Sequence, residues 1–123
     1  MLCFTMGILL NGQSMSKPPI LILDFEARSM AKHEVASFTD DLRKAIDSTQ
    51  GYTILDKSVV EAVFAESGRD RSKCYDVECG LQNGRLLGAE YIIVGYIEKE
   101  GNSYTIGAQF ISAKSGKAER EKI

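Results

Sequence analysis

Two cysteines, Cys74 and Cys79, are the residues in this 123-residue chain whose type and spacing could do chemistry. They stand five positions apart, one in a loop and the other near the start of an expected helix. A local disulfide can therefore join them if the backbone turns between them. In the chain-entropy model so short a loop stabilises a fold by only about 2 kcal/mol. The alternative is a pair of reduced, partly buried thiols.

Neither a catalytic dithiol nor a zinc site fits this pair well. A redox dithiol favours two intervening residues at a helix N-terminus, and four separate these cysteines. A zinc site needs about four ligands, which two cysteines and the distant His33 do not supply. We therefore expect no metal and no cofactor, and a thiol-redox protein using Cys74 and Cys79 stays the less favoured function.

Two further side chains invite a catalytic interpretation. His33, the one histidine, stands at the polar start of an expected helix without a nucleophile pattern, so we interpret it as solvated. Asp24 follows an apolar run, at the strand end where α/β sheets often place functional carboxylates. The favoured interpretation of Asp24 is a hydrogen-bond acceptor for a neighbouring loop or helix terminus. The sequence predicts that the protein is not an enzyme.

Charge narrows the classes of partner. The chain has 15 basic and 17 acidic residues spread along it, for a net charge of −2. Such a distribution lacks the clustered positive charge that binds nucleic acid or an anionic membrane. The glycines near position 84 lack the spacing and the lysine of a phosphate-binding loop. One local basic tract could dock a protein partner through Arg69, Arg71 and Lys73, the alternative being an ordinary charged loop.

The stretch 86–95 organises the expected fold. It predicts a helix end, a stop at Gly88, which can adopt positive φ, and then a strongly apolar strand. The run from Tyr91 to Val94 is typical of a strand covered on both faces. Gly95 within it predicts that another group packs close against the backbone there.

Hydrophobic periodicity supplies the remaining elements. We expect strands at 20–25, 52–55, 91–98, 104–112 and 118–122, and helices at 32–48, from Asp56 or Ser58 to Ser67, and at 76–87. Gly80 and Gly84 weaken the last helix by about 1 kcal/mol each relative to alanine. The order β-α-β-α-α-β-β-β predicts an α/β, or α+β layered, domain with a mixed sheet of about five strands.

The first 17 residues differ from the rest of the chain. An apolar run at 2–10 is too short to span a bilayer and is typical of a secretory signal, although no basic residue precedes it. We interpret residues 1–17 as a leader, with a disordered tail as the alternative. Pro18 and Pro19 then begin a single domain over 18–123.

Six short segments carry a family resemblance through their order and spacing. They are Ile22-Leu23-Asp24-Phe25, Leu42-Arg43, Leu55-Asp56-Lys57-Ser58, the pair Cys74 and Cys79, the stretch 86–95, and Tyr104-Thr105-Ile106. Together they resemble the CsgG-like family, which includes the curli secretion protein CsgG, the flagellar protein FlgO and the penicillin-binding-protein activator LpoB. The chain is also similar to the N-terminal domain of the translocation protein TolB, and the resemblance covers about residues 18–122.

This resemblance implies an exported bacterial domain at the periplasm or the outer-membrane periphery of a Gram-negative-type cell. It implies that the domain acts through contacts with envelope protein partners or a second copy of itself. Membrane association would need a lipid anchor upstream, because Cys3 lacks the preceding small residues of a lipoprotein signal. The family continues into more sheet and a C-terminal helix, so we expect a C-terminally truncated domain. A small-ligand sensor with an apolar pocket between helices and sheet is the alternative.

Overall fold

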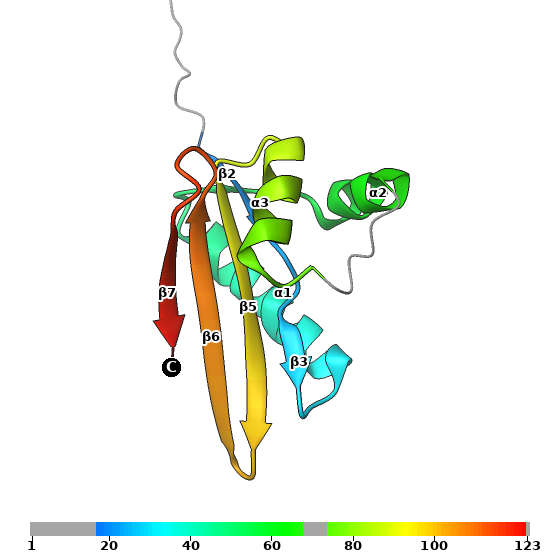
Figure 1. Ribbon diagram of the computed structural model, residues 1–123, viewed down its shortest axis with the longest axis vertical. Helices are drawn as coiled ribbons and strands as arrows, with labels where there is room; N and C mark the ends of the chain where they lie inside the picture. The colour runs from blue at the N-terminus through cyan, green and yellow to red at the C-terminus, as the bar shows by residue number, and fades with distance from the viewer. Residues whose placement is uncertain (1–16, 68–73, 123) are drawn as a thin grey trace, which may run out of the picture.

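The structure is a computed structural model that describes residues 17–67 and 74–122. The predicted leader and the basic tract with Arg69, Arg71 and Lys73 lie outside the described residues. The elements in chain order are β2 (Pro19–Ile22), β3 (Glu26–Arg28), α1 (Lys32–Ser48), β4 (Thr53–Ile54), α2 (Lys57–Ser67), α3 (Val77–Leu86), β5 (Tyr91–Glu100), β6 (Ser103–Ser112) and β7 (Ala118–Lys122). This confirms the predicted α/β class with a mixed, open sheet (Figure 1).

The sheet combines a parallel half with an antiparallel half. Its strands run in the order β4-β2-β5-β6-β7, and β3 pairs with β5 beyond the end of β2. The pairs of β2 with β4 and of β5 with β2 and β3 are parallel, whereas β6 and β7 add to β5 as an antiparallel meander. The strand predicted at 91–98 is therefore central, and it extends to Glu100.

The first strand is interrupted, although the sequence predicted one continuous strand at 20–25. Ile22 pairs with Ile93, and Glu26 pairs with Tyr96. The chain therefore takes four steps on one side of the ladder (22 to 26) against three on the other (93 to 96). The extra residue is a bulge, which separates β2 from β3. Leu23 still donates its backbone N–H to the Ile93 carbonyl oxygen at 3.1 Å, and the ladder resumes at Glu26.

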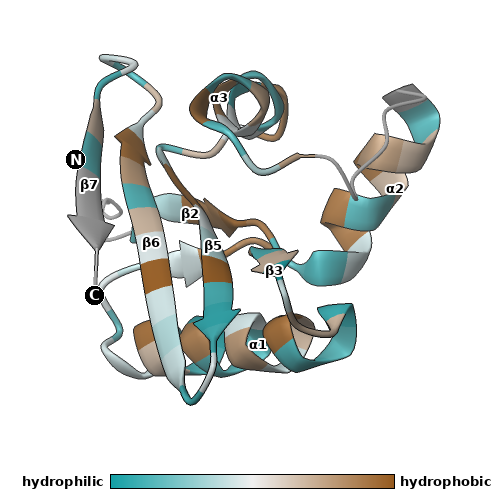
Figure 2. Cartoon of the chain, turned by 60° about the horizontal axis from the view of Figure 1, so that its bottom comes forward, coloured by the Kyte–Doolittle hydropathy of each residue, from teal (hydrophilic) through white to brown (hydrophobic). Residues whose placement is uncertain are grey.

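Helices cover both faces of the sheet and define two cores (Figure 2). On one face α1 packs its Val35 side chain against Ile20 and Ile22 of β2. On the other face α2 and α3 enclose a second core. Its buried members are Leu21, Leu23, Val60, Phe64, Cys74, Ala89, Ile92, Val94, Ile111 and Ala113. Alternate residues of β2 and β5 enter opposite cores, which confirms that the central strand is covered on both faces.

Helix α3 lies unusually close to the central strand because of its two glycines. A Cβ atom at Gly80 would lie 2.8 Å from Val94 Cγ1, and one at Gly84 would lie 2.4 Å from Ile92 Cγ1. The glycines that lower helix propensity are thus the residues that let the helix approach the sheet. Gly88 then ends the segment with φ +77°, as predicted.

Gly95 also has close neighbours, which confirms its predicted role. A Cβ atom there would lie 2.3 Å from the carbonyl oxygen of Gly107 and 2.7 Å from the Phe25 ring. Phe25 is buried because the bulge turns it onto the α1 face of the sheet.

We expect Gly95→Ala to lower the free energy of unfolding by about 1–3 kcal/mol, because the added methyl group must displace backbone or the Phe25 ring. Urea denaturation of the full chain measures the change. Gly51→Ala is the matched control, since its Cβ atom would meet Thr49 Oγ1 at an ordinary 3.6 Å. Equal stability of the two variants would contradict the close packing.

Candidate functional site

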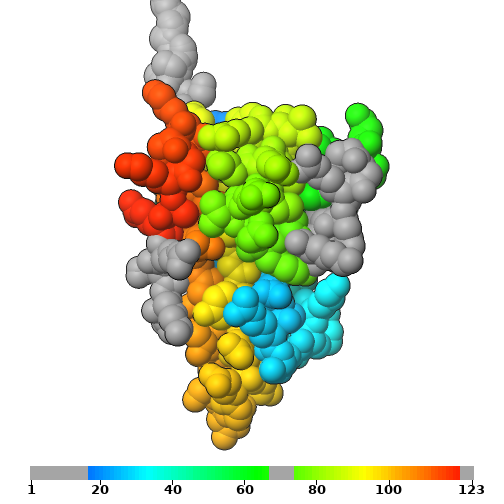
Figure 3. Space-filling model, viewed as in Figure 1, coloured from blue at the N-terminus to red at the C-terminus, as the bar shows by residue number. Residues whose placement is uncertain are grey.

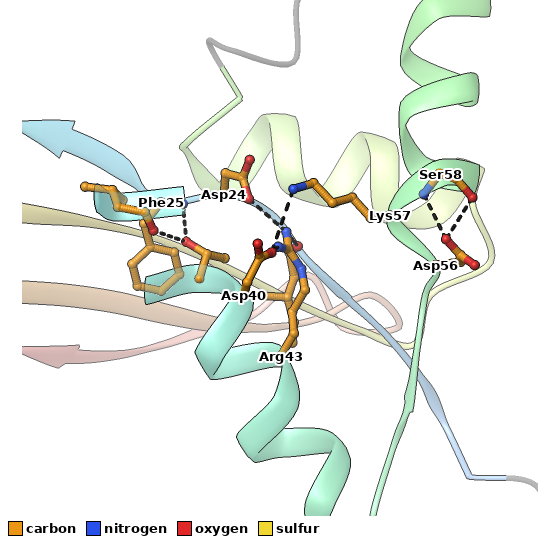
Figure 4. Close-up of polar contacts among 10 residues, drawn as sticks. Asp24, Phe25, Asp40, Arg43, Asp56, Lys57 and Ser58 are labelled. Atoms are coloured by element: carbon orange, nitrogen blue, oxygen red, sulfur yellow. Dashed lines mark hydrogen bonds and ion pairs between the residues drawn. The ribbon is translucent and has the colours of Figure 1, made fainter. Parts of the chain in front are cut away.

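A polar cluster fills the break between β2 and β3, and its central residue is Arg43 of α1 (Figure 4). Arg43 Nη2 donates to the carbonyl oxygen of Ile22 at 2.6 Å and to Asp24 Oδ1 at 3.0 Å. Arg43 Nη1 donates to Asp40 Oδ1 at 2.7 Å. A carbonyl at the end of a strand thereby receives a charged donor, in place of a neighbouring strand.

The other side of the break is satisfied by Thr39, one helical turn before Arg43. The backbone N–H of Phe25 donates to Thr39 Oγ1 at 3.2 Å, and Thr39 Oγ1 donates to the carbonyl oxygen of Val35 at 2.9 Å. Thr39 is fully buried. Two side chains of α1 therefore replace the ladder hydrogen bonds that the bulge removes.

Among the described residues, this cluster pairs charges of both signs. Two carboxylates, Asp24 and Asp40, face two cations, Arg43 and Lys57, with Lys57 Nζ lying 3.7 Å from Asp40 Oδ1. The Arg43 side chain is only 14% exposed and that of Asp24 is 24% exposed. Asp24 is a hydrogen-bond acceptor, as predicted, and the Arg43 side chain of α1 is a donor that reaches it. The arrangement ties α1 and the start of α2 to the first strand.

Asp56 caps helix α2. Its Oδ1 accepts from the backbone N–H of Ser58 at 2.9 Å and from Ser58 Oγ at 2.8 Å. Of the two predicted caps, the structure therefore selects Asp56. The backbone hydrogen bond from Ser58, and then the hydroxyl hydrogen bond, lower the pKa of the Asp56 carboxyl below its ordinary value of 3.8.

A disulfide joins Cys74 to Cys79 across a Cα–Cα distance of 5.4 Å. Cys74 is 1% exposed and belongs to the core that α2 and α3 enclose. Cys79 lies in the first turn of α3, where its backbone N–H donates to the N-cap residue Asp76 at 2.8 Å. The bridge therefore fastens the start of α3 to the core.

Asn83 lies against both cysteines, a position that the sequence did not predict. Its Nδ2 donates to the Cys79 carbonyl at 2.8 Å and lies 3.4 Å from Cys79 Sγ and 3.7 Å from Cys74 Sγ. Asn83 is fully buried, and its Oδ1 has no hydrogen-bond partner in the described part of the chain. Its position four residues after Cys79, on one helix face, is the signal that could have identified it.

The remaining predicted residues lie apart from these two clusters. His33 is exposed in the first turn of α1. Among residues 17–67 and 74–122, no three His, Cys, Asp or Glu side chains gather closely enough to hold a metal ion. Within the same residues, no helix has the length and apolar character that crossing a membrane requires.

A cavity of about 380 Å³ opens beyond the end of α3, where β5 begins and β6 ends. It is lined by Arg85, Gly88, Ala89, Glu90, Tyr91, Ser112, Ala113 and Lys114. Two Arg85 donors, Nε and Nη2, are already bound to the Ala113 carbonyl at 3.0 and 2.7 Å. Arg85 belongs to α3, and Tyr91 and Ser112 belong to the sheet, so the cavity lies at the edge between that helix and the sheet. The ligand-sensor alternative stays a prediction.

We expect Arg43→Met to lower the free energy of unfolding by about 2–3 kcal/mol, because the Ile22 carbonyl and the Asp24 carboxylate lose a charged donor away from bulk water. Lys57→Met removes one cation from the same cluster at a longer, exposed contact and should cost less than about 1 kcal/mol. Urea denaturation compares them. A larger effect at Lys57 would contradict the central role of Arg43.

The Asp56 cap should make stability depend on pH in a defined direction. Because folding lowers the pKa of this carboxyl, its contribution is present above 3.8 and is lost as the pH falls through the folded-state value. Asp56→Ala should therefore destabilise the protein at neutral pH, with a difference from wild type that shrinks in acid. Ser58→Ala, which keeps the backbone donor, should show part of the effect. A difference independent of pH would contradict the cap.

Comparison by sequence finds no matching protein-family model and no matching curated protein. Comparison by structure does find matches. The LpoB C-terminal domain from Salmonella enterica has a TM-score of 0.68 at 14% identity, covering 88% of this chain and 83% of that domain. Lipoprotein GNA1162 from Neisseria meningitidis has a TM-score of 0.64 at 18% identity, covering 86% of this chain and 79% of that protein.

TolB from Acinetobacter baumannii also matches, with a TM-score of 0.62 at 11% identity. The likeness covers 88% of this chain but 23% of TolB. These matches confirm the predicted resemblance at the level of the fold. The described domain has the fold of the LpoB C-terminal domain.

Proposed function

We propose that this protein is a non-enzymatic, exported bacterial interaction domain that takes part in cell-envelope or secretion-complex assembly. It acts through contacts with envelope proteins at the periplasm or the outer-membrane periphery. The observation that carries the proposal is the fold, which matches the LpoB C-terminal domain over 88% of this chain and a lipoprotein over 86%.

The disulfide supports an exported location. Disulfides persist in oxidising compartments such as the bacterial periplasm and are rare in the cytosol. Cys74 and Cys79 are bridged within the core of the domain, where the bond fixes the start of α3. The apolar run at residues 2–10, interpreted as a leader, would fit the same compartment.

The polar cluster supports a role without catalysis. The carboxylates of Asp24 and Asp40 both contact Arg43, and Lys57 adds a second cation beside Asp40. A general base needs access to a substrate proton within hydrogen-bond reach. The described donors that reach these carboxylates belong to α1 and α2, which favours a structural role.

The basic tract is the surface that we propose for partner docking. Arg69, Arg71 and Lys73 lie between α2 and α3, so the two helices that cover one face of the sheet flank the tract in the chain. Three cations within five residues fit an acidic patch on an envelope protein. The contact would be sensitive to ionic strength.

The test is cross-linking in intact cells of the native bacterium. One variant of the full chain reverses the charge of the tract through Arg69→Glu, Arg71→Glu and Lys73→Glu. The control variant reverses three other charges through Lys32→Glu, Lys44→Glu and Lys114→Glu. We expect a specific adduct with one envelope protein, or with a second copy, that survives the control reversal and is lost on reversal of the tract. Mass spectrometry of the membrane and periplasmic fractions measures it.

The control variant changes the net charge by the same amount, at three residues that are exposed on the described surface. Equal loss of the adduct in both variants would show that the basic tract is not the docking surface, while the interaction itself would stand. The absence of any specific adduct, or recovery of the full chain only from the cytosol, would overturn the proposed function.

A further inference from the structure

The two sulfur atoms of the disulfide differ in their surroundings. Cys74 is 1% exposed and lies in a core with Leu21, Val60 and Phe64. Cys79 is half-buried in the first turn of α3, at the edge of that core. Cys79 is therefore the more accessible cysteine of the pair for an external thiol or disulfide.

Their capacity to hold negative charge differs in the same direction. A thiolate at Cys79 would have the N-terminal dipole of α3 and Asn83 Nδ2, 3.4 Å from Cys79 Sγ, as stabilising groups. Asp76, the N-cap residue, and Glu78, which precedes Cys79, carry negative charge and oppose ionisation, so the proposal rests first on accessibility. A thiolate at Cys74 would lie among apolar side chains, where charge is costly.

We propose that Cys79 is the residue at which this protein exchanges disulfides with external thiols, and that Cys74 is the buried thiol that closes the bond. The partner is a small disulfide, or an oxidoreductase with a dithiol or disulfide site. The inference concerns how the bond is made and broken, and it is independent of the interaction function proposed above.

Oxidation of the dithiol then follows two displacements. The Cys79 thiolate attacks one sulfur of the external disulfide, forms a mixed disulfide and releases one external thiolate. The Cys74 thiolate next attacks Cys79 Sγ, forms the internal disulfide and releases the second external thiolate. Two electrons pass from the protein to the external disulfide, and the two thiolates released take up the protons that the cysteines lose.

Reduction runs through the same intermediate in reverse. An external thiolate attacks the accessible Cys79 Sγ and must expel the Cys74 thiolate into the apolar core. Exchange is faster when the leaving thiol is more acidic, and burial among apolar groups makes Cys74 a poor leaving group. The closed bond is therefore reduced slowly as long as the core around Cys74 stays packed.

Glutathione disulfide is the probe for the test, and every chain carries Cys3→Ser so that the third cysteine does not react. Reduced full chains with Cys74→Ala or Cys79→Ala retain a single thiol each. We expect glutathione to add to Cys79 at least about tenfold faster than to Cys74 in the folded chains. Mass spectrometry follows the adduct over time.

In concentrated urea the two rates should converge, which shows that folding causes the difference. A second experiment keeps both Cys74 and Cys79. The oxidised chain with Cys3→Ser is treated with limiting reduced glutathione and quenched in acid, and the position of the adduct is mapped by mass spectrometry. Glutathione should be found on Cys79. Glutathione on Cys74, or equal rates in the folded single-thiol chains, would overturn the proposal.

Asn83 is a positioning residue in this scheme, and its effect has a distinct readout. In the Cys74→Ala background, Asn83→Leu should raise the pH at which Cys79 reaches half its maximal reaction rate. A merely structural role would change stability without moving that pH midpoint. An unchanged midpoint would remove Asn83 from the scheme, whereas the site of exchange would be judged by the glutathione mapping.

Discussion

The hydrogen bond from Arg43 to the Ile22 carbonyl is the interaction on which the arrangement of the described domain depends. At that point the first strand carries one residue more than the central strand, so the ladder cannot continue in register. Arg43 and Thr39 of α1 receive the backbone groups that the bulge releases. The helix is thereby fixed against the sheet by polar contacts as well as by its apolar face.

The bulge also determines how the central strand is packed. It lets Phe25 turn onto the α1 face and rest against Gly95, the position where β5 has no side chain. On the opposite face, Gly80 and Gly84 let α3 approach Ile92 and Val94 in the same way. Missing Cβ atoms on both sides of β5 thus allow the helix and an aromatic ring to come closer than side chains would permit. Figure 3 shows α3 lying over the upper half of the sheet, with β3, β5 and β6 forming the surface below it.

Much of the fold could be predicted because its elements obey simple periods. The helix at Lys32–Ser48 and the strand at Ala118–Lys122 have the predicted bounds. Apolar spacing marks the helix, and the turn at residues 113–116 precedes the strand. The break after Ile22 could not be predicted, because the run to Phe25 is continuously apolar and the residues that stabilise the break lie on a helix. Asn83 was missed for a related reason, since its role depends on a sulfur atom one helical turn away.

The disulfide and the polar cluster fix different layers of the domain, and the difference bears on how it could serve as an interaction module. Arg43 holds α1 to the parallel half of the sheet through bonds within the folded chain. The Cys74–Cys79 bond holds the start of α3, beside the segment that contains the basic tract. In the sequence, the tract lies between the end of α2 and Cys74. Cys74 is buried and bridged, so the chain that directly follows the tract is already ordered before a partner binds and loses little conformational entropy there.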